Sequence, residues 1–344
     1  MGFKVVNIFA LPGADFGDEL IDSLGVTLVK GVWKTEEEII AQAHDADAII
    51  GTVSMQPFNR RLLAALSKCR VIAGIGIGYD STDVEAATEL GIAVTNVPDY
   101  CLDEVSGLAI TYMLALGHRL LQIDRAVRER RIAFNMDKKA LDDIAFPMFR
   151  MRDQTLGIVG LGKIGTVTAL KAQGLGMRVI AYDPYVLGPV MESRGVKPVD
   201  LDTLLRESDF ITLHTPLTSE TRNMFGYEQF KKMKRTAYFI NTARGGCVDQ
   251  PGLIQALKEG LIAGAGIDVT VDEPIAPDNS LLTMPNVILT GHTAWYSVTS
   301  EVDLNRRPMT QVVQALRGEL PIYTVNTDVK TKWMTRWGKI EERK

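Results

Sequence analysis

Short runs of apolar and β-branched residues alternate with stretches of helical character along most of the chain. Parallel strands need a crossover connection that is usually a helix, so this alternation predicts parallel sheets with helices on their faces. The strands are expected at 4–9, 48–53, 70–74, 92–95, 155–160, 177–182, 209–213, 236–241, 264–269 and 286–290. The helices are expected at 36–44, 59–67, 83–90, 102–130, 163–175, 200–206, 227–233, 250–259 and about 298–317. The predicted fold class is α/β.

The alternation falls into two series, one before about residue 101 and one from about residue 153. A chain of 344 residues also exceeds the usual size of one hydrophobic core. We therefore expect two doubly wound parallel-sheet domains with a ligand-binding cleft between them. One domain is predicted to consist of 1–101 and 296–344, and the other of 102–295.

Two segments have no clean hydrophobic period. Residues 131–150 are interpreted as an arm or loop. The tail beyond about residue 326 carries Trp333 and Trp337, one helical turn apart. This spacing favours a packing contact with this subunit or a neighbouring one over a role in ligand binding.

The composition excludes several classes of partner. The formal net charge is −4 and no block of five like charges occurs, so no nucleic-acid partner is expected. Cys69, Cys101 and Cys247 lack metal-ligand spacing, which indicates a reduced, cytoplasmic chain without a metal site. The longest apolar helix candidate, 107–117, is too short to span a bilayer, and residues 1–13 are interpreted as a first strand, not a signal peptide.

The strongest local motif follows the strand expected at 155–160. It reads Gly160-Leu161-Gly162-Lys163-Ile164-Gly165 and leads into a helix. The first glycine permits a tight turn, the second leaves space for a pyrophosphate, and the third lets helix and strand approach closely. The amides at the helix N-terminus, including that of Ile164, and the charge of Lys163 favour the pyrophosphate anion. This motif predicts a Rossmann dinucleotide-binding domain.

The next strand indicates which dinucleotide binds. It ends in Asp183, eighteen residues after the last glycine. A carboxylate there can accept both hydroxyls of the adenosine ribose and repels a 2′-phosphate. Pro184-Tyr185 supplies no arginine for such a phosphate, so the cofactor is predicted to be NAD rather than NADP.

Polar residues follow three later strands. Arg244 lies in "NTARGG", Asp268 ends the strand of "GAGIDV", Glu273 lies in the next loop, and His292 lies in "GHTAWYS". The carboxyl ends of parallel strands line one crevice, so these side chains are expected near the nicotinamide. Separately, Arg244 could be a surface cation, Glu273 a solvated acid and Asp268 a helix-capping carboxylate. Their occurrence at successive strand ends favours a catalytic interpretation instead.

This grouping suits one reaction type. Arg244 can bind a carboxylate and polarise an adjacent carbonyl. His292 can give a proton to the carbonyl oxygen or take one from the alcohol, and Glu273 would favour the imidazolium and set its tautomer.

The other histidines fit an acid–base role less well. His44 is predicted to lie at the surface, and His118 is predicted to make an interhelical hydrogen bond. His214 ends a strand and is predicted to line the nicotinamide site together with Thr215 and Pro216.

The motifs "GLGKIG", "YDP", "LHTPLTSET", "NTARGGCVD", "GAGIDVTVDEP" and "PNVILTGHTAWYS" resemble signatures of the D-isomer-specific 2-hydroxyacid dehydrogenases. The resemblance covers roughly residues 45–320. Within the family, the stretch "HTAWYS" is similar to the branch of the C-terminal-binding proteins and their bacterial relatives. It implies a flavodoxin-like substrate domain beside the Rossmann domain. It also implies the catalytic set Arg244, Glu273 and His292.

The same resemblance implies further site residues and an assembly. Asp268 would bind the nicotinamide carboxamide, with Thr242 and Ala243 also at the cofactor. Backbone amides around Gly74-Ile75-Gly76 would bind the substrate carboxylate, and Trp295 would contact the substrate side chain. A homodimer with its main contact in 102–150 is implied. Gly291 stands where the family usually has a proline, and this change is expected to loosen the loop of His292. Lys163 stands where arginine is commoner, and this change is expected to weaken pyrophosphate binding.

The resulting hypothesis is an NAD-dependent enzyme that interconverts a 2-oxo acid and its D-2-hydroxy acid. Formate oxidation is disfavoured because family members that perform it lack the glutamate, whereas phosphite oxidation stays open. Trp295 favours a substrate with an apolar or aromatic side chain. The alternative is a dimeric NADH-sensing binding protein that recruits partners, like a corepressor, with vestigial activity.

Overall fold

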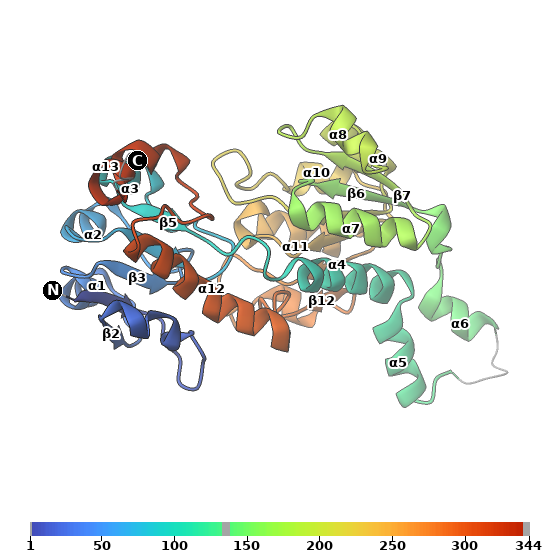
Figure 1. Ribbon diagram of the computed structural model, residues 1–344. Coiled ribbons are helices and arrows are strands. Elements are labelled where there is room, and N and C mark those ends of the chain that lie inside the picture. The colour runs from blue at the N-terminus through green and yellow to red at the C-terminus, as the bar shows by residue number, and fades with distance from the viewer. Residues whose placement is uncertain (1, 133–137, 340–344) are drawn as a thin grey trace. The chain divides into compact units, whose positions relative to one another are not determined.

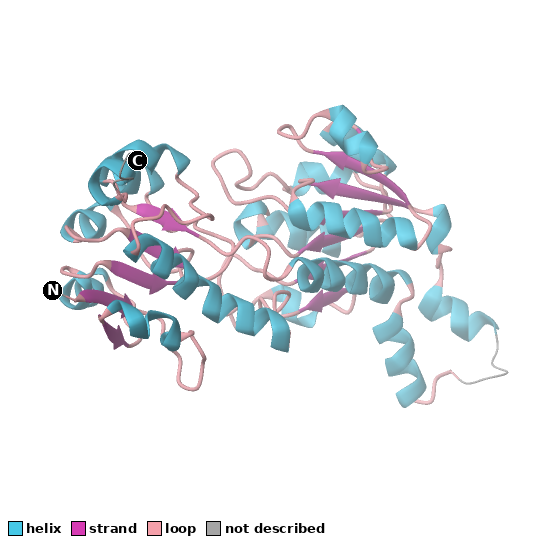
Figure 2. Cartoon of the chain, viewed as in Figure 1, coloured by secondary structure: helices cyan, strands magenta, loops and turns pink. Residues whose placement is uncertain are grey.

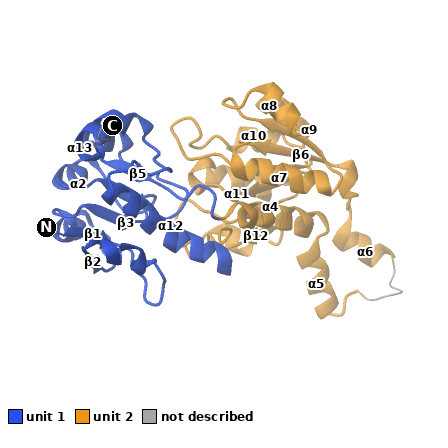
Figure 3. Cartoon of the chain, in the orientation of Figure 1, with its two compact units in different colours: residues 1–100, 297–344 blue, residues 101–296 orange. Residues whose placement is uncertain are grey.

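The computed structural model describes residues 2–132 and 138–339 of the chain. The chain divides into two compact units (Figure 3). Unit 1 consists of Met1–Tyr100 and Ser297–Lys344, and unit 2 consists of Cys101–Tyr296. In each unit the strands lie between helices (Figure 2).

The sheet of unit 1 has five strands in the order β2-β1-β3-β4-β5, and every neighbouring pair is parallel. This is the flavodoxin-like strand order. The strands are β1 (Phe3–Asn7), β2 (Val26–Lys30), β3 (Ala48–Gly51), β4 (Val71–Gly74) and β5 (Ala93–Thr95).

Helices cover the unit 1 sheet, and four of them begin at side-chain caps. Thr35 and Glu38 form a capping box at the first helix, and Asn59, Asp83 and Ser297 cap three others. Apolar residues of the helices that Thr35, Asn59 and Asp83 cap, and of the strands, form one buried cluster. The helices are α1 (Glu36–Ala43), α2 (Arg60–Ala65), α3 (Val84–Leu90), α12 (Val298–Leu316) and α13 (Lys330–Trp337).

The sheet of unit 2 has seven strands in the order β12-β11-β10-β9-β6-β7-β8, again all parallel (Figure 1). Counted from its own first strand, this is the Rossmann order extended by one strand. The strands are β6 (Thr155–Val159), β7 (Arg178–Tyr182), β8 (Lys197–Pro198), β9 (Phe210–Leu213), β10 (Tyr238–Asn241), β11 (Gly264–Ile267) and β12 (Val287–Leu289). The predicted fold class is confirmed.

Both faces of this sheet are buried. Along β10, Tyr238 and Ile240 belong to one apolar cluster and Phe239 to the other, as the two-residue period of a strand requires. Helices α4 and α7 pack together on the first face. The helices of unit 2 are α4 (Leu102–Gly117), α5 (Leu120–Arg128), α6 (Lys138–Ala145), α7 (Lys163–Gly174), α8 (Gly188–Ser193), α9 (Leu201–Glu207), α10 (Tyr227–Lys232) and α11 (Gln250–Lys258).

Three predictions of local structure are wrong. The helix expected at 102–130 ends at Gly117 and resumes at Leu120, because Arg119 adopts a left-handed φ of 47°. Strand β2 was not expected, since it is a partly exposed edge strand with a weak apolar pattern. The segment 131–150 contains helix α6, and its residues 133–137 lie outside the described part of the chain.

No helix of the described residues combines the length and apolar character needed to cross a membrane.

The tail packs against unit 1. Trp333 is fully buried, and its indole Nε1 donates a hydrogen bond to the carbonyl oxygen of Arg70 at 2.8 Å. The guanidinium of Arg70 lies 4.8 Å from the ring centroid of Trp337 and 4.8 Å from that of Phe3. The predicted packing role of the two tryptophans is confirmed for this subunit. The last residues, 340–344, lie outside the described part of the chain.

Replacing Trp333 by Ala should lower the free energy of unfolding by about 3 to 5 kcal/mol, because a fully buried indole leaves a large cavity. Urea denaturation measures the change. The matched control is Met334→Ala on the same helix, whose side chain is exposed and whose loss should change the free energy of unfolding far less. Equal effects of the two substitutions would contradict the packing role.

Candidate active site

The carboxyl ends of the parallel strands of unit 2 meet at one edge, where the glycine motif forms a tight turn. Gly160 follows β6 with φ 91°, and a Cβ there would come within 2.9 Å of the carbonyl oxygen of His214. A Cβ on Gly165 would lie 2.2 Å from the carbonyl oxygen of Gly160. A Cβ on Gly162 would have no heavy atom within 4 Å. The first and third glycines therefore allow close backbone approach, while the second leaves open space.

The residues around this turn fit a dinucleotide. Gly162 is the N-cap of α7, which begins at the exposed Lys163 and continues through Ile164, so the helix N-terminus faces the open space. Asp183 follows β7. Its carboxylate accepts hydrogen bonds from the backbone amides of Leu161 at 2.8 Å and Tyr185 at 2.9 Å. The buried Oγ1 of Thr242 has no hydrogen-bond partner among the described residues. A bound cofactor would supply one.

His214 lies at the same edge but remains neutral. Its Nε2 is 3.1 Å from the Oγ1 of Thr212, and burial lowers the pKa of the His214 imidazole to about 3. It therefore cannot serve as a proton donor near neutral pH. Thr215 and Pro216 follow it, and the Cγ2 of Thr215 would lie 3.0 Å from a Cβ on Gly160.

Two histidines lie away from this edge. His44 is exposed after α1, as predicted. His118 is exposed at the end of α4, and its side chain makes no hydrogen bond to any described residue, so the predicted interhelical bond is wrong.

His292 forms a hydrogen-bonded pair with Glu273. The imidazole Nδ1 lies 2.7 Å from Oε2 of Glu273, and the two side chains keep 44% and 40% of their surface exposed. The histidine itself has a left-handed φ of 58°. The ring is thus fixed by one nitrogen while the pair remains open to solvent and ligands.

The environment of Glu273 keeps it ionised. Partial burial raises the pKa of this carboxyl, but the hydrogen bond and charge of His292, the amide of Thr270 at 3.2 Å and the charge of Arg244 together lower it below its ordinary value of 4.5. Since the pKa is lower in the folded chain than in the unfolded chain, the pair stabilises the fold at neutral pH. This contribution is lost as the pH falls below 4.5 through the folded-state pKa.

Arg244 is positioned by a braced turn after β10. The side chain of Asn241 accepts the amide of Ala243 at 3.0 Å and donates to the carbonyl oxygen of Arg244 at 2.9 Å. The Arg244 guanidinium donates through Nη1 to the Ala243 carbonyl oxygen at 2.8 Å. A Cβ on Gly245 would lie 2.0 Å from the Thr270 carbonyl oxygen, so this turn lies against the loop that carries Glu273.

Asp268 is almost completely buried at the end of β11. Its Oδ1 accepts the hydroxyl of Thr290 and the amide of Thr293 at 2.9 Å, and its Oδ2 accepts the amide of Ala294 at 3.1 Å. Its carbonyl oxygen accepts the amide of His292 at 2.7 Å. The predicted contact of this carboxylate with a nicotinamide carboxamide stays a prediction.

The remaining predicted site residues lie at other places. Gly74-Ile75-Gly76 ends β4 of unit 1, and Gly76 has φ 105°. The amide of Ile75 donates to the carbonyl oxygen of Gly51 at 2.8 Å. Trp295 lies near the end of unit 2, edge-to-face with Tyr296 at 5.5 Å between centroids. The cleft predicted between the two domains stays a prediction.

Sequence reasoning missed three residues that shape the site: Asn241, Thr290 and Tyr112. Asn241 and Thr290 stand directly beside motif residues, in "INTARGG" and "ILTGH", so their place at strand ends was a usable signal. Tyr112 lies in an apolar helix and carries no such signal.

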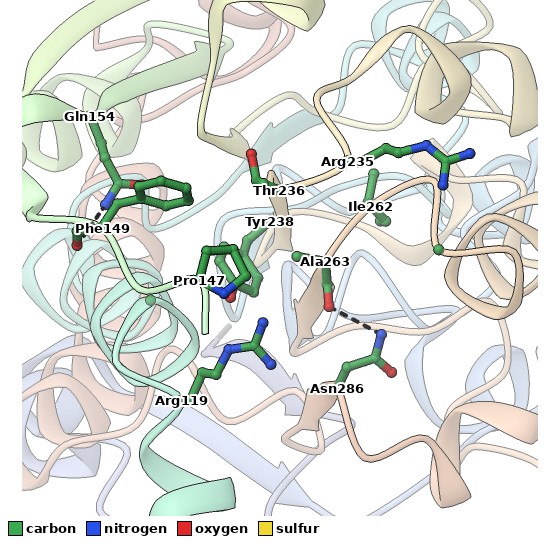
Figure 4. Close-up of a pocket in the computed structure, with 12 residues that line it drawn as sticks. Arg119, Pro147, Phe149, Gln154, Arg235, Thr236, Tyr238, Ile262, Ala263 and Asn286 are labelled. Carbon is green, nitrogen blue, oxygen red and sulfur yellow. Dashed lines mark hydrogen bonds between the residues drawn. The ribbon is translucent and has the colours of Figure 1, made fainter. Parts of the chain in front are cut away.

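A cavity of about 240 Å³ lies at the opposite, amino-terminal edge of the unit 2 sheet (Figure 4). Tyr238 at the start of β10 and Asn286 just before β12 line it, together with Arg119, Arg235 and Phe149. None of the predicted site residues lines this cavity.

Unit 2 is thus a Rossmann-type dinucleotide-binding domain with a His–Glu pair at the carboxyl edge of its sheet. Residues 110–294 match the family model "D-isomer specific 2-hydroxyacid dehydrogenase, NAD binding domain". The chain belongs to this family, which confirms the resemblance and the predicted cofactor, NAD.

Individual relatives agree with this assignment. The glyoxylate reductase of Korarchaeum cryptofilum is 39% identical over 303 residues, which cover 87% of this chain and 90% of that protein. The glycerate dehydrogenase of Methylorubrum extorquens is 40% identical over 265 residues, 76% of this chain and 80% of that protein. The structure of D-lactate dehydrogenase from Aquifex aeolicus, complexed with NAD and lactic acid, matches with a TM-score of 0.78 and 28% identity over 91% of this chain and 94% of that one.

Replacing His292 by Gln should raise the pKa of Glu273, because the imidazole supplies the largest downward influence while partial burial, which raises the pKa, remains. A ¹³C NMR titration of the Glu273 carboxyl measures this. His214→Gln is the control and should leave the Glu273 titration unchanged. An unaltered titration in the His292 variant would show that the pair does not form in solution.

Proposed function

We propose that this chain is an NAD-dependent D-2-hydroxyacid dehydrogenase that interconverts a 2-oxo acid and its D-2-hydroxy acid. The observation that carries the proposal is the His292–Glu273 pair, at 2.7 Å, in the same domain as the dinucleotide turn. An exposed histidine fixed by a carboxylate is suited to proton transfer, and the only redox partner that the proposal needs is the family's cofactor.

His292 is proposed as the acid–base residue, acting through Nε2. Its Nδ1 is engaged by Glu273, so Nε2 is the nitrogen that can carry a proton toward the substrate oxygen. In reduction Nε2 gives this proton to the carbonyl oxygen, and in oxidation it takes the hydroxyl proton. The ionised Glu273 stabilises the imidazolium and holds the ring. When bound, the nicotinamide supplies or accepts the hydride.

Arg244 is proposed to bind the substrate carboxylate and to polarise the adjacent carbonyl. Its backbone is braced by Asn241, and its charge acts on the same loop as Glu273. In the turn after β4 we propose that Gly76 offers an amide to the carboxylate, since the amide of Ile75 is already used by Gly51. Trp295 is proposed to contact the substrate side chain.

The cofactor contacts are proposed from the turn and the strand ends. Gly160, Gly162, Lys163, Ile164 and Gly165 would hold the pyrophosphate and Asp183 the adenosine ribose. The nicotinamide end would lie near the residues that follow β9, β10 and β11, which are His214, Thr215, Pro216, Thr242, Ala243 and Asp268. We assign NAD binding to 102–295 and substrate binding to the remainder of the chain.

A cytoplasmic location is proposed from the thiols. Cys69, Cys101 and Cys247 are all buried thiols, and burial raises the pKa of Cys69 to about 12. Buried thiols of this kind suit a reducing compartment.

NADH oxidation at 340 nm across glyoxylate, hydroxypyruvate, pyruvate, 2-oxoisocaproate and phenylpyruvate tests the function. We expect turnover of at least one acid and a loss of about 10² to 10⁴ in kcat for His292→Gln, with NADH affinity unchanged, because the imidazole acts only in proton transfer. His44→Gln, at an exposed position in unit 1, is the matched control. A preference for phenylpyruvate over pyruvate would support the role of Trp295, and the reverse preference would contradict it.

Two results would overturn the mechanism. A His292→Gln protein with most of its turnover would remove the acid–base role. NADH binding without turnover of any acid would instead favour a binding protein that senses NADH.

We also propose a homodimer formed through the face that α5, α6 and the following loop present. Helices α5 and α6 follow one another along the chain (Figure 1). This α5–α6 face is defined by large apolar side chains that are exposed in the single chain. They are Leu120, Leu121, Val127, Leu141, Phe146, Met148 and Phe149. Such a concentration of apolar surface on adjoining elements is typical of a subunit interface.

Phe146→Asp should convert the dimer into a monomer, because a charge at the interface loses its solvation without gaining a partner. Sedimentation-velocity measurements report the assembly. The control is Ile322→Asp in unit 1, since Phe146 and Ile322 are equally exposed in the single chain, at 73% and 74%. A Phe146→Asp protein that sediments like the parent would exclude this face as the interface.

A further inference from the structure

A buried tyrosine on α4 is connected to the loop of His292 by two successive hydrogen bonds. Tyr112 is 1% exposed, and its hydroxyl lies 2.6 Å from Oγ1 of Thr290. Thr290, which follows β12, hydrogen-bonds in turn to Oδ1 of Asp268. The connection joins α4 to the ends of β11 and β12, which come much later in the sequence.

The direction of both bonds follows from the chemistry of the groups. An ionised carboxylate only accepts, so the single hydroxyl proton of Thr290 points to Asp268. The Tyr112 hydroxyl must then donate to the oxygen of Thr290. Burial raises the pKa of Tyr112, so its phenol keeps this proton across the working pH range. Hydrogen bonds that run in one direction polarise and strengthen one another.

Asp268 also forms hydrogen bonds with the backbone around His292. Its carboxylate accepts the amides of Thr293 at 2.9 Å and Ala294 at 3.1 Å, and its carbonyl oxygen accepts the amide of His292 at 2.7 Å. Three consecutive amides of the loop therefore bind to one buried residue.

The loop needs such external support. Gly291 precedes the histidine, and a glycine gives the backbone more freedom than any other residue. His292 also adopts φ 58°, which a residue with a Cβ holds only when its surroundings impose it. The hydrogen bonds of the loop amides to Asp268 and the contact of the imidazole with Glu273 support this conformation.

The sheet is shaped to receive the Tyr112 ring. A Cβ on Gly266 of β11 would lie 2.5 Å from Cγ and 2.8 Å from Cβ of Tyr112, and its three nearest heavy atoms would all belong to that tyrosine. The absence of a side chain at Gly266 therefore admits the ring and brings its hydroxyl to Thr290.

We propose that Tyr112 is a positioning residue for the proposed acid–base residue His292, acting through Thr290 and Asp268. The inference rests on the proposed function for its catalytic consequence, but its structural part is independent of that function. Tyr112 itself touches neither substrate nor cofactor in this proposal. Its hydroxyl fixes Thr290, which fixes the carboxylate that holds the loop.

Amide hydrogen exchange measured by NMR tests the structural part without any reaction. In Tyr112→Phe and in Thr290→Val we expect the amides of Thr293 and Ala294 to exchange about fivefold faster, the effect of losing one ordinary hydrogen bond. Tyr238→Phe is the matched control, because it removes the hydroxyl of another buried tyrosine at the opposite edge of the same sheet. Unchanged exchange of these amides in both Tyr112→Phe and Thr290→Val would overturn the proposal.

Kinetics of the same variants test the catalytic part. Tyr112→Phe and Thr290→Val should each lower kcat about three- to tenfold, whereas Thr290→Ser, which keeps the hydroxyl, should stay close to the parent. If Tyr112 acts through Thr290, the double variant should be no slower than Thr290→Val alone. Additive losses would mean that Tyr112 acts by another route and would overturn the proposal.

The two failures can be told apart. Faster exchange of the loop amides in a protein that reduces no 2-oxo acid would reject the proposed function and support the structural link. Normal exchange and normal kcat in an active enzyme would reject the link and leave the function in place. Gly266→Ala tests the position of the ring, because the added Cβ would lie 2.5 Å from Cγ of Tyr112. This variant should reproduce the faster amide exchange of Tyr112→Phe.

Discussion

Parallel pairing of every strand in unit 2 is the constraint on which the candidate site depends. Each crossover returns the chain to the same starting edge, so the carboxyl ends of β6, β7, β9, β10, β11 and β12 all lie at the opposite edge. Residues between 160 and 292 in the sequence are thereby brought to one place. Helices and apolar clusters cover both faces of the sheet, which leaves its carboxyl edge for the polar side chains.

Much of this arrangement was predictable, because it depends on local patterns. The glycine turn, Asp183, Arg244, Glu273 and His292 each stand beside a strand-like run, and the rule for parallel sheets then groups them. The site roles themselves remain proposals. The link between Tyr112 and Thr290 was not predictable, since it joins residues 178 positions apart and depends on the missing side chain of Gly266. The break between α4 and α5 and the edge strand β2 were missed because backbone conformation and partial exposure leave weak traces in the pattern of apolar residues.

His214 and His292 illustrate how one edge of a sheet can give the same side chain two chemical characters. Burial lowers the pKa of His214 to about 3, which leaves a neutral imidazole next to the glycine turn. His292 is exposed, and the carboxylate of Glu273 lies 2.7 Å from its Nδ1. The difference arises from solvation and one ionic partner, and neither could be assigned from the residue type.

The left-handed backbone of His292 lowers the stability of the folded chain. A residue with a Cβ in this conformation costs about 1 to 2 kcal/mol, a penalty that glycine escapes. Glycine at this position would remove the penalty but would also remove the hydrogen bond to Glu273, so the two effects on stability oppose each other. A laboratory library screened only for melting temperature would show which of the two effects is larger. In the proposed mechanism the reaction needs an imidazole at this position, so the proposed function would account for the strained backbone.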